Sequence, residues 1–413
     1  MQVPFFRPDI SEAAIDDVTA TIRSGWLTTG PRVKRFEEEF AAAVGARHAV
    51  ALNSCTAALH LACVTLGLQE GQGVLIPTMT MAATAEVVRY QGAVPILVDC
   101  EPDTMNMDLA DAEAKIEALR AGRLPEALDP EMPIVGMIPV HVGGWLMDIE
   151  AIEDFAERHG LWVVEDAAHA FPAAWRSTPE RPWRRCGGAT SAVSCFSFYA
   201  NKTITTGEGG MATTDDPEVA ERIRLLSLHG LSADAWGRFT AKASWDYRIV
   251  APGYKYNLTD IAAAIGLHQL ERAESLRQQR QNLAQRYYEL LGDLEEGELP
   301  PQPDARRLHS WHLFLLRLRL DQLGIDRLEF TTALRDRGVG HSVHWRPLHL
   351  HPYWRETFGW RPQDLPTATE CWQRIVSLPL FPTMTEAEMD WVVTVIRDLC
   401  HQHRRRGVAA ERV

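Results

Sequence analysis

The chain of 413 residues lacks several features that mark particular protein classes. Its seven cysteines are scattered without any Cys-x-x-Cys pair, which excludes a disulfide framework and a zinc ribbon. No Gly-x-Gly-x-x-Gly follows the first expected strand, so the chain does not resemble a Rossmann oxidoreductase. No apolar run is long enough to span a bilayer, and we expect no membrane segment.

Basic residues are also fewer than acidic ones. The 42 Lys and Arg residues face 55 Asp and Glu residues, for a net charge of −13. A nucleic-acid partner would need a basic face, so none is expected. The chain shows no signal peptide, and its scattered cysteines fit a reducing compartment, so we expect a cytoplasmic protein. With 46% hydrophobic residues the composition is that of a globular protein, and the length predicts two domains.

Short apolar segments alternate with helical patterns along the first part of the chain. We expect strands at residues 48–52, 74–77, 94–98, 134–140, 161–166, 193–196 and 211–214. Continuous apolar strands separated by helices predict an α/β fold with a mostly parallel sheet that helices cover on both faces. This large domain is predicted to span residues 1–270, and a long helix starts at residue 261.

A smaller α+β domain is predicted at residues 271–400, with strands at 311–320 and 340–345, and a flexible tail at 401–413. Two inserted segments, 118–133 and 177–186, have no role that the sequence reveals.

The functional argument starts from residues 195–210, CFSFYANKTITTGEGG. This stretch begins as a strand and ends in a Thr- and Gly-rich turn, with Lys202 between the two. Desolvation at the end of a strand disfavours the ammonium form of a lysine, and a free amine can form a Schiff base. On composition alone, a surface lysine beside a turn is the commoner case.

Other candidates follow neighbouring strands. Ligands of parallel sheets gather at the carboxyl ends of the strands, where Asp166 and residues 54–56 are expected. The 54–56 junction combines hydroxyl groups with a helix N-terminus, which suits an anion. A carboxylate such as Asp166 can hold a protonated ring nitrogen, and His169 can face the same pocket. From spacing alone, simple helix caps and a core histidine stay equally open.

Together these motifs resemble the DegT/DnrJ/EryC1/StrS family of sugar aminotransferases, which are pyridoxal-phosphate (PLP) enzymes of fold type I. The likeness follows the chain in order, at residues 25–31, 165–170, 195–210, 252–260 and 377–382. Three further phrases are most similar to members that aminate C4 of UDP-4-keto-pentoses, at residues 229–231, 234–236 and 311–314.

The resemblance implies a role for each matching residue. Lys202 would bind PLP as a Schiff base and move the proton of the reaction, and Asp166 would keep the pyridinium nitrogen protonated. His169 would lie near the ring hydroxyl. The phosphate would be held by Cys55, Thr56 and Ser197.

The resemblance also implies a homodimer, because Asn257 would reach the phosphate from a second subunit. Thr29 and His344 are candidate substrate residues, and Trp345, His349 and Tyr353 are further pocket candidates. For His344 and these three residues, a packing role is equally open. No metal is implied. The expected reaction moves an amino group from glutamate to a nucleotide-linked keto sugar. Candidate cations for the sugar nucleotide's phosphates are Arg32, Lys34, Lys255 and Arg346, and ordinary surface charge is an equally open interpretation of each.

Two residues depart from the family pattern. Cys55 stands where the family usually has Gly or Ala, although a backbone contact to phosphate would survive the change. Met81 stands where many members place an aromatic ring against the cofactor, and its thioether can still pack on a ring face.

Two alternatives stay open beside the aminotransferase. Sugar dehydratases of the same family typically carry His in place of the lysine, so Lys202 argues against that activity. A non-catalytic homologue could keep the fold, but the joint presence of Lys202, Asp166, Ser197 and Asn257 favours retained chemistry.

Overall fold

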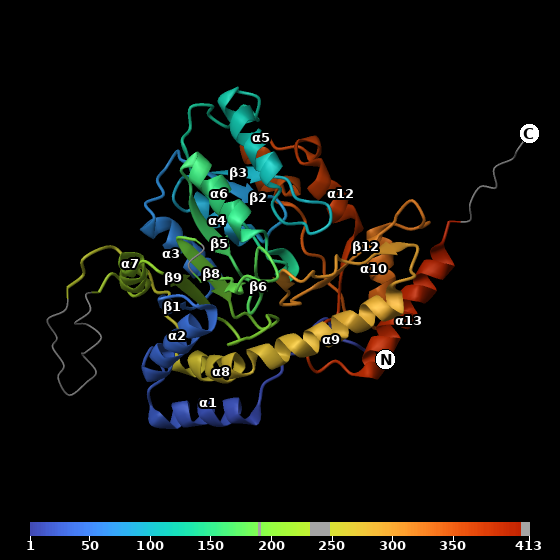
Figure 1. The fold of residues 1–413 in the computed structure, drawn as a ribbon, viewed down its shortest axis with the longest axis horizontal. Coiled ribbons are helices and arrows are strands. Elements are labelled where there is room, and N and C mark those ends of the chain that lie inside the picture. Colours follow the sequence, from blue (N-terminus) through green and yellow to red (C-terminus); the bar gives the residue numbers. More distant parts are fainter. Residues whose placement is uncertain (189–190, 232–247, 406–413) are drawn as a thin grey trace, which may run out of the picture.

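The computed structural model describes residues 1–188, 191–231 and 248–405 (Figure 1). These residues form a central seven-stranded sheet in the order β1-β9-β8-β5-β4-β2-β3. The strands are β1 (His48–Leu52), β2 (Gly73–Pro77), β3 (Val94–Val98), β4 (Ile134–Met137), β5 (Trp162–Asp166), β8 (Val193–Ser197) and β9 (Gly210–Thr214). Only β9 runs against its neighbours, β8 and β1, and the other pairings are parallel. The expected α/β class with a mostly parallel sheet is confirmed.

Helices pack on both faces of this sheet, as the alternating pattern predicts. The helices of this part are α1 (Glu12–Ser24), α2 (Pro31–Val44), α3 (Cys55–Thr65), α4 (Ala82–Arg89), α5 (Leu109–Arg120), α6 (Ile149–His159), α7 (Pro217–Ser227) and α8 (Asp260–Glu271). One apolar cluster joins the sheet to α3, α4, α5, α6 and α7. A second cluster joins it to α2 and α8, where Phe36 and Phe40 of α2 contact the ring of Phe198.

The C-terminal part has a core of its own around a three-stranded sheet, β10-β12-β13. Its elements are α9 (Ala273–Leu291), β10 (Gly297–Glu298), β12 (Phe314–Leu318), α10 (Arg327–Asp336), α11 (Pro352–Phe358), α12 (Pro366–Arg374), β13 (Ile375–Leu378) and α13 (Glu386–His403). A further small sheet consists of β11 (Arg307–Leu308), β6 (Ala174–Trp175) and β7 (Arg184–Arg185). The N-terminus also packs here, since Val3 donates its N–H to the carbonyl of Gly338.

Several expected boundaries differ from the structure. The strand expected at 340–345 was wrong: within these residues the structure has an isolated bridge between Ser342 and Ser377 of β13 and no longer ladder. The long helix expected from residue 261 is divided at Arg272 into α8 and α9. The 118–133 insertion begins inside α5, and α13 continues two residues beyond 401. The division into two domains near residue 271 stays a prediction.

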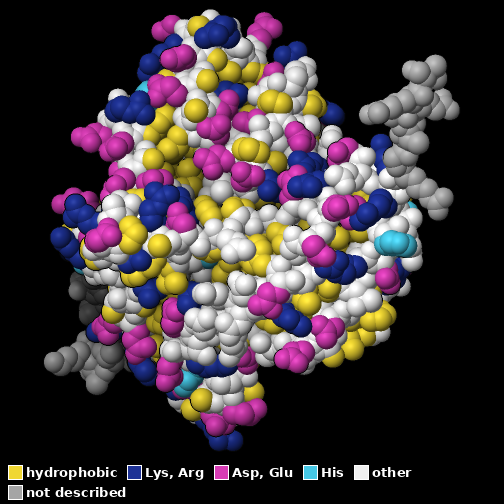
Figure 2. All heavy atoms as spheres, turned by 45° about the vertical axis from the view of Figure 1, so that its right-hand side comes forward, with side chains coloured by type: hydrophobic (Ala, Val, Ile, Leu, Met, Phe, Trp, Pro, Cys, Tyr) yellow, Lys and Arg dark blue, Asp and Glu magenta, His cyan; other side chains and the backbone are white. Residues whose placement is uncertain are grey.

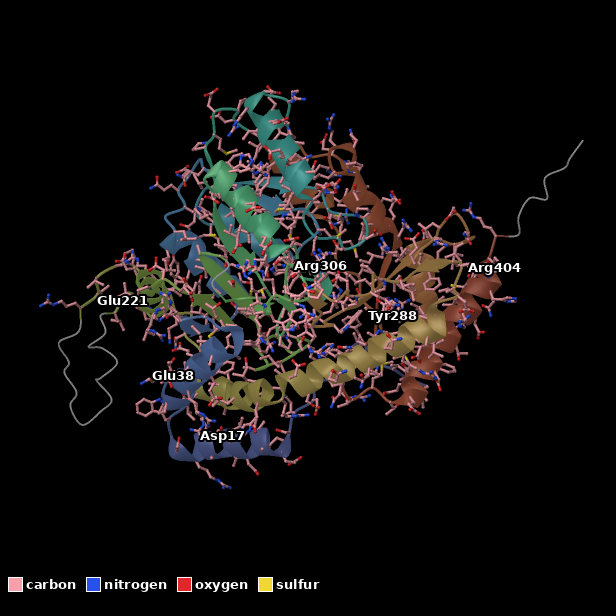
Figure 3. The ribbon with its side chains drawn as sticks, in the orientation of Figure 1. Asp17, Glu38, Glu221, Tyr288, Arg306 and Arg404 are labelled. Atoms are coloured by element: carbon pink, nitrogen blue, oxygen red, sulfur yellow. The ribbon has the colours of Figure 1, made fainter. Side chains whose placement is uncertain are left out.

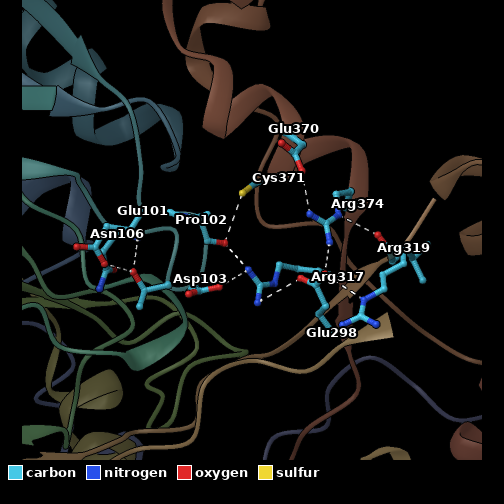
Figure 4. A network of polar contacts seen from close by, with 12 residues as sticks. Glu101, Pro102, Asp103, Asn106, Glu298, Arg317, Arg319, Glu370, Cys371 and Arg374 are labelled. Carbon is cyan, nitrogen blue, oxygen red and sulfur yellow. Dashed lines mark hydrogen bonds and ion pairs between the residues drawn. The ribbon is translucent and has the colours of Figure 1, made fainter. Parts of the chain in front are cut away.

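An ion-pair network connects the loop after β3 to the C-terminal sheet (Figure 4). Arg317 of β12 donates to the carbonyl of Pro102 and pairs with Asp103 at 3.0 Å. On its other side Arg317 meets Glu298 of β10 at 3.6 Å, and Glu298 also pairs with Arg374 at 2.8 Å. Arg317 is buried and Glu298 is partly buried, so their pair is better shielded from solvent than an exposed one, whereas Asp103 lies at the surface.

Acidic and basic side chains are interspersed over the face shown in Figure 2. This mixture is typical of a solvated surface and continues the charge balance of the sequence. Among the helices that the structure describes, none has the length and apolar character needed to cross a bilayer.

Candidate active site

A pocket of about 340 Å³ opens at the carboxyl ends of β1, β2, β5 and β8. Nine of the residues expected at the site line it together: Cys55, Thr56, Met81, Asp166, His169, Ser197, Lys202, His344 and Trp345. They come from segments up to 290 positions apart in the chain (55 to 345), so the fold brings them together. The position agrees with the rule that parallel sheets bind ligands beyond their strand ends.

Lys202 lies on the loop after β8, where its N–H donates to the carbonyl of Tyr199 at 3.0 Å. Burial lowers the pKa of its amine to about 8, although the nearby Asp166 carboxylate opposes the change. A lysine with this pKa carries a useful fraction of free amine near neutral pH. Because Lys202 is partly buried and lines the pocket, it is not a plain surface lysine.

Asp166 ends β5 and is buried at the base of the pocket. Its Oδ2 accepts a hydrogen bond from the Thr84 hydroxyl at 2.8 Å, and its Oδ1 accepts one from the N–H of Ala168 at 3.1 Å. Burial raises the pKa of this carboxyl, and the Thr84 and Ala168 hydrogen bonds act against that effect. The carboxylate is fixed in position and faces the same pocket as Lys202.

The N-terminus of α3 forms the opposite end of the pocket. Ser54 caps this helix by accepting the N–H of Ala57 at 3.0 Å, so Ser54 is a helix cap as the simpler interpretation holds. Half-buried Thr56 follows in the first turn and faces the pocket, whose anion-binding character comes from the amides of that turn. Gly210 of β9 lets the sheet approach this turn closely, because a Cβ there would lie 2.3 Å from the carbonyl carbon of Ser54.

Cys55 is the first residue of α3 and is buried in the wall of the pocket. Its thiol turns away from the helix end, donates to the carbonyl of Cys195 at 3.4 Å and lies 4.0 Å from Oδ1 of Asp166. Burial raises the pKa of the Cys55 thiol, which is neutral. A contact from Cys55 to an anion would therefore come from its backbone N–H, as expected for a position that is usually Gly or Ala.

Histidine and tryptophan side chains form one wall. His169 accepts the N–H of Gly143 on Nδ1 at 3.2 Å, and its ring stacks on Trp345 at 5.0 Å between centroids. His344 bonds to the hydroxyl of Ser377 at 2.7 Å. Burial lowers the pKa of His169 well below its usual range and that of His344 to about 3, so both rings are neutral. At the mouth, Met81 keeps 59% of its surface exposed.

Thr29 and Asn257 do not line this pocket. They bond to each other instead, from the Asn257 amide to the Thr29 hydroxyl at 2.7 Å, and the Lys255 ammonium donates to Asn257. Thr29 lines a separate groove between α2 and α7. The backbone explains this placement, because Asn257 bridges to Leu52 on the outer side of the sheet edge.

The four candidate cations also lie elsewhere. Arg32 pairs at 2.6 Å with Asp17 of α1, and Lys34 pairs at 3.8 Å with Glu38 of α2. Figure 3 labels Asp17 and Glu38 on these two helices. Arg346 donates to the carbonyl of Leu350. Of the other pocket candidates, His349 is buried between two threonine hydroxyls and Tyr353 is an exposed surface residue. Among the described residues, Lys202 is the one cationic side chain that lines the pocket.

Several lining residues had no signal in the sequence, namely Thr80, Tyr199 and Glu208. Thr84, which bonds to Asp166, was also missed. The spacing of four between Thr80 and Thr84 at a helix start places both hydroxyls on one side, but a sequence does not reveal which carboxylate they meet. The Asp234–Trp236 phrase lies outside the described residues.

A second polar cluster lies beside Asp166. His141, Glu165 and Cys186 bring potential metal-ligating atoms within 4.8 Å of one another. His141 accepts the N–H of Met147 on Nδ1 and meets Glu165 through Nε2 at 3.1 Å, so both ring nitrogens have protein partners. Ser191 and Ser194 bond to the other oxygen of Glu165. These contacts account for the cluster as a buried hydrogen-bond network.

Comparison with known proteins identifies the class. A model of the DegT/DnrJ/EryC1/StrS aminotransferase family matches residues 8–397, so the chain belongs to this family. The spore coat polysaccharide biosynthesis protein SpsC of Bacillus subtilis is 42% identical over 398 residues, which cover 96% of this chain and 97% of SpsC.

Solved structures agree in fold over nearly the whole chain. Spr1654 of Streptococcus pneumoniae, in its PMP-form, has a TM-score of 0.85 at 29% identity and covers 97% of this chain and 98% of its own. The same protein is known in a PLP-form. The sugar aminotransferase CalS13 of Micromonospora echinospora has a TM-score of 0.80 at 26% identity, over 96% of this chain and 99% of its own. Fold type I, expected from the resemblance, is confirmed.

Proposed function

We propose that this chain is a PLP-dependent aminotransferase that moves an amino group from glutamate to C4 of a nucleotide-linked keto sugar. The product would be an amino sugar for a cell-envelope glycan or a glycosylated natural product. The observation that carries the proposal is one pocket holding a low-pKa lysine, a buried carboxylate and a helix N-terminus. An elongated cofactor with a phosphate, an aldehyde and a ring nitrogen needs these three groups together.

The residues present fit that cofactor. The first turn of α3, with Thr56 and Ser197, would hold the phosphate, and Asp166 would hold the ring nitrogen at the other end. When bound, the cofactor supplies an electron sink that makes a C–H bond beside nitrogen acidic. Lys202, with its lowered pKa, would bind the aldehyde carbon and carry the proton between donor, acceptor and cofactor. His169 would pack beside the ring and exclude water from one face.

The sugar acceptor is supported by the relatives and by the mouth of the pocket. SpsC is named for spore coat polysaccharide biosynthesis, and CalS13 is a sugar aminotransferase. At the mouth, His344, Trp345 and Tyr199 offer aromatic surfaces and neutral hydrogen-bonding groups, which suit a hydroxylated ring. We propose that the enzyme acts in the cytoplasm, where nucleotide sugars are made. All seven cysteines are buried and free, which fits a reducing compartment.

The enzyme is proposed to be a homodimer with shared sites. Asn257 and Lys255 lie outside the pocket of their own chain, on the surface beside Thr29. In a dimer they would approach the partner's pocket and add the positive charge that one chain lacks. The dehydratase alternative is disfavoured by Lys202 in the pocket, and the non-catalytic one by the lowered pKa of that lysine.

The absorption spectrum of the purified protein, before and after glutamate, tests the proposal. Wild-type protein should show the visible band of the cofactor bound through Lys202, and glutamate should replace it with a near-ultraviolet band. Lys202→Ala should lack the visible band from the start. Adding candidate keto sugar nucleotides to the glutamate-treated protein should restore it, and the sugar that does so fastest identifies the acceptor. A protein that stays colourless with added PLP would refute the proposal.

A further inference from the structure

The side chains of Thr80 and Thr84 form a hydrogen-bonded row that ends at the carboxylate of Asp166. The hydroxyls of Thr80 and Thr84 lie 2.7 Å apart, and the Thr84 hydroxyl lies 2.8 Å from Oδ2 of Asp166. Both threonines are buried, with exposures of 2% and 0%. Thr80 also lines the pocket, so the row runs from the pocket wall to the carboxylate.

The direction of the hydrogen bonds in this row is fixed by chemistry. A carboxylate only accepts, so the single hydroxyl proton of Thr84 is donated to Asp166. The oxygen of Thr84 must then accept from Thr80, which donates its own proton. Each bond polarises the next in the same sense, and the row presents its positive end to the carboxylate.

Helix geometry makes Thr84 available for this bond. Within a helix interior a threonine hydroxyl commonly bonds to the carbonyl one turn earlier. Thr84 is the third residue of α4, where no earlier helical turn exists, and α4 has no side-chain cap at Met81. Its hydroxyl is therefore directed to a partner outside the helix.

We propose that Thr84, oriented by Thr80, is a positioning residue that keeps Asp166 ionised and aimed at the ring nitrogen of the cofactor. This inference rests on the proposed function, in which Asp166 holds that nitrogen. Burial alone would favour the protonated acid, which could not hold a pyridinium proton. The Thr84 hydroxyl is the strongest of the groups that oppose that effect at Asp166.

The test compares Thr84→Val, which removes the hydroxyl at nearly constant shape, with Thr84→Ser, which keeps it. The first measurement uses cofactor-free protein and follows the infrared band of the protonated carboxyl against pH. Asp166→Asn identifies the contribution of this residue to the band. A hydrogen bond to a charged group is strong enough to move the midpoint upward by about one pH unit or more in Thr84→Val.

The second measurement is the dissociation constant of PLP. We expect it to rise about tenfold or more in Thr84→Val, to rise a few-fold in Thr80→Val, and to stay within about twofold in Thr84→Ser. A thermal unfolding curve for each variant separates this effect from general destabilisation.

The outcomes distinguish this inference from the proposed function. If Asp166→Asn weakens PLP binding but Thr84→Val changes neither the infrared midpoint nor the dissociation constant, the threonine row has no such role. If Asp166→Asn itself leaves PLP binding unchanged, the proposed function fails and not only the role of Thr84. Equal effects of Thr84→Val and Thr84→Ser would show that packing, and not the hydroxyl, matters.

Discussion

At the scale of single residues, the lysine gives the sharpest prediction. With its pKa lowered to about 8 by burial, the neutral amine of Lys202 increases as pH rises through 8. Between pH 7 and pH 8 the free-amine fraction grows roughly fivefold and then levels off. The rate at which cofactor-free protein captures PLP should follow that curve, measured as growth of the visible band after rapid mixing.

A model amine provides the control for this experiment. Nα-acetyl-lysine, whose amine has an ordinary pKa near about 10.4, should react with a midpoint more than about two pH units higher. Capture by the protein with the same high midpoint would mean that Lys202 is solvated, contrary to its position in the pocket. Lys202→Ala should show no fast phase at any pH.

Cys55 provides a second prediction at this scale. Because its thiol faces Cys195 and Asp166 and not the helix end, Cys55→Ala should leave the dissociation constant of PLP within about twofold of wild type. The lost packing should cost about 1 kcal/mol of unfolding free energy. Thr56→Val is the matched variant, since it removes a hydroxyl that faces the pocket, and it should weaken binding clearly. Weakening by Cys55→Ala but not by Thr56→Val would reverse this assignment.

Residue types and their order were sufficient to predict most residues that line the pocket. They did not predict the residues behind the lining, such as Thr84. Lys202, Asp166 and His169 follow strand ends in motifs, so the general rule for parallel sheets places them together. Thr84 had no such signal, because its partner Asp166 lies 82 positions away. Asn257 was assigned by resemblance to a role across a subunit boundary, which a single chain does not test.

At the scale of elements, α2 depends on a cap that comes from far along the chain. Its own N-cap is Gly30, which offers no side-chain oxygen. Asp260 of α8 takes that place, accepting the N–H of Arg32 at 3.2 Å and that of Val33 at 3.0 Å while fully buried. Asp260→Ala should lower the unfolding free energy by about 2 kcal/mol, because two amide donors and the helix end lose their partner.

Chemical denaturation measures that loss as a shift in the midpoint. Asp336→Ala is the control, since Asp336 is an exposed acid at the end of α10, and its removal should change stability by less than about 0.5 kcal/mol. Equal, small effects of both substitutions would show that α2 does not need the distant cap.

This cap also shows what limits prediction of elements. Helix α6 begins and ends at local signals, because Asp148 caps its N-terminus and Gly160 ends it in the left-handed conformation. Residues 340–345 have a pattern that is compatible with a strand. In the C-terminal sheet, however, β13 (Ile375–Leu378) is the strand that pairs with β12, and His344 and Trp345 line the pocket instead. Local capping signals are therefore sufficient to predict where a helix begins and ends. The strands of the C-terminal part depend on which distant segments pair with each other, and a local pattern does not reveal that.

At the scale of the whole molecule, the proposed sharing of a site between two chains gives the last prediction. One chain provides the lysine, the carboxylate and the helix end, and Asn257 lies outside its own pocket. If the site is shared as proposed, a complete site needs Lys202 from one subunit and Asn257 from its partner. Sedimentation should then give a species of twice the 46.3 kDa chain mass.

Mixing two inactive variants tests the sharing directly. Lys202→Ala and Asn257→Ala should each have little activity at low PLP, and they are unfolded, mixed in equal amounts and refolded together. Half of the dimers are then hybrids, and in each hybrid one site combines an intact Lys202 with an intact Asn257 from the other subunit. About a quarter of the wild-type activity should return. If Asn257 served its own chain, every site in a hybrid would keep one defect and no activity would return, because neither subunit would hold both residues.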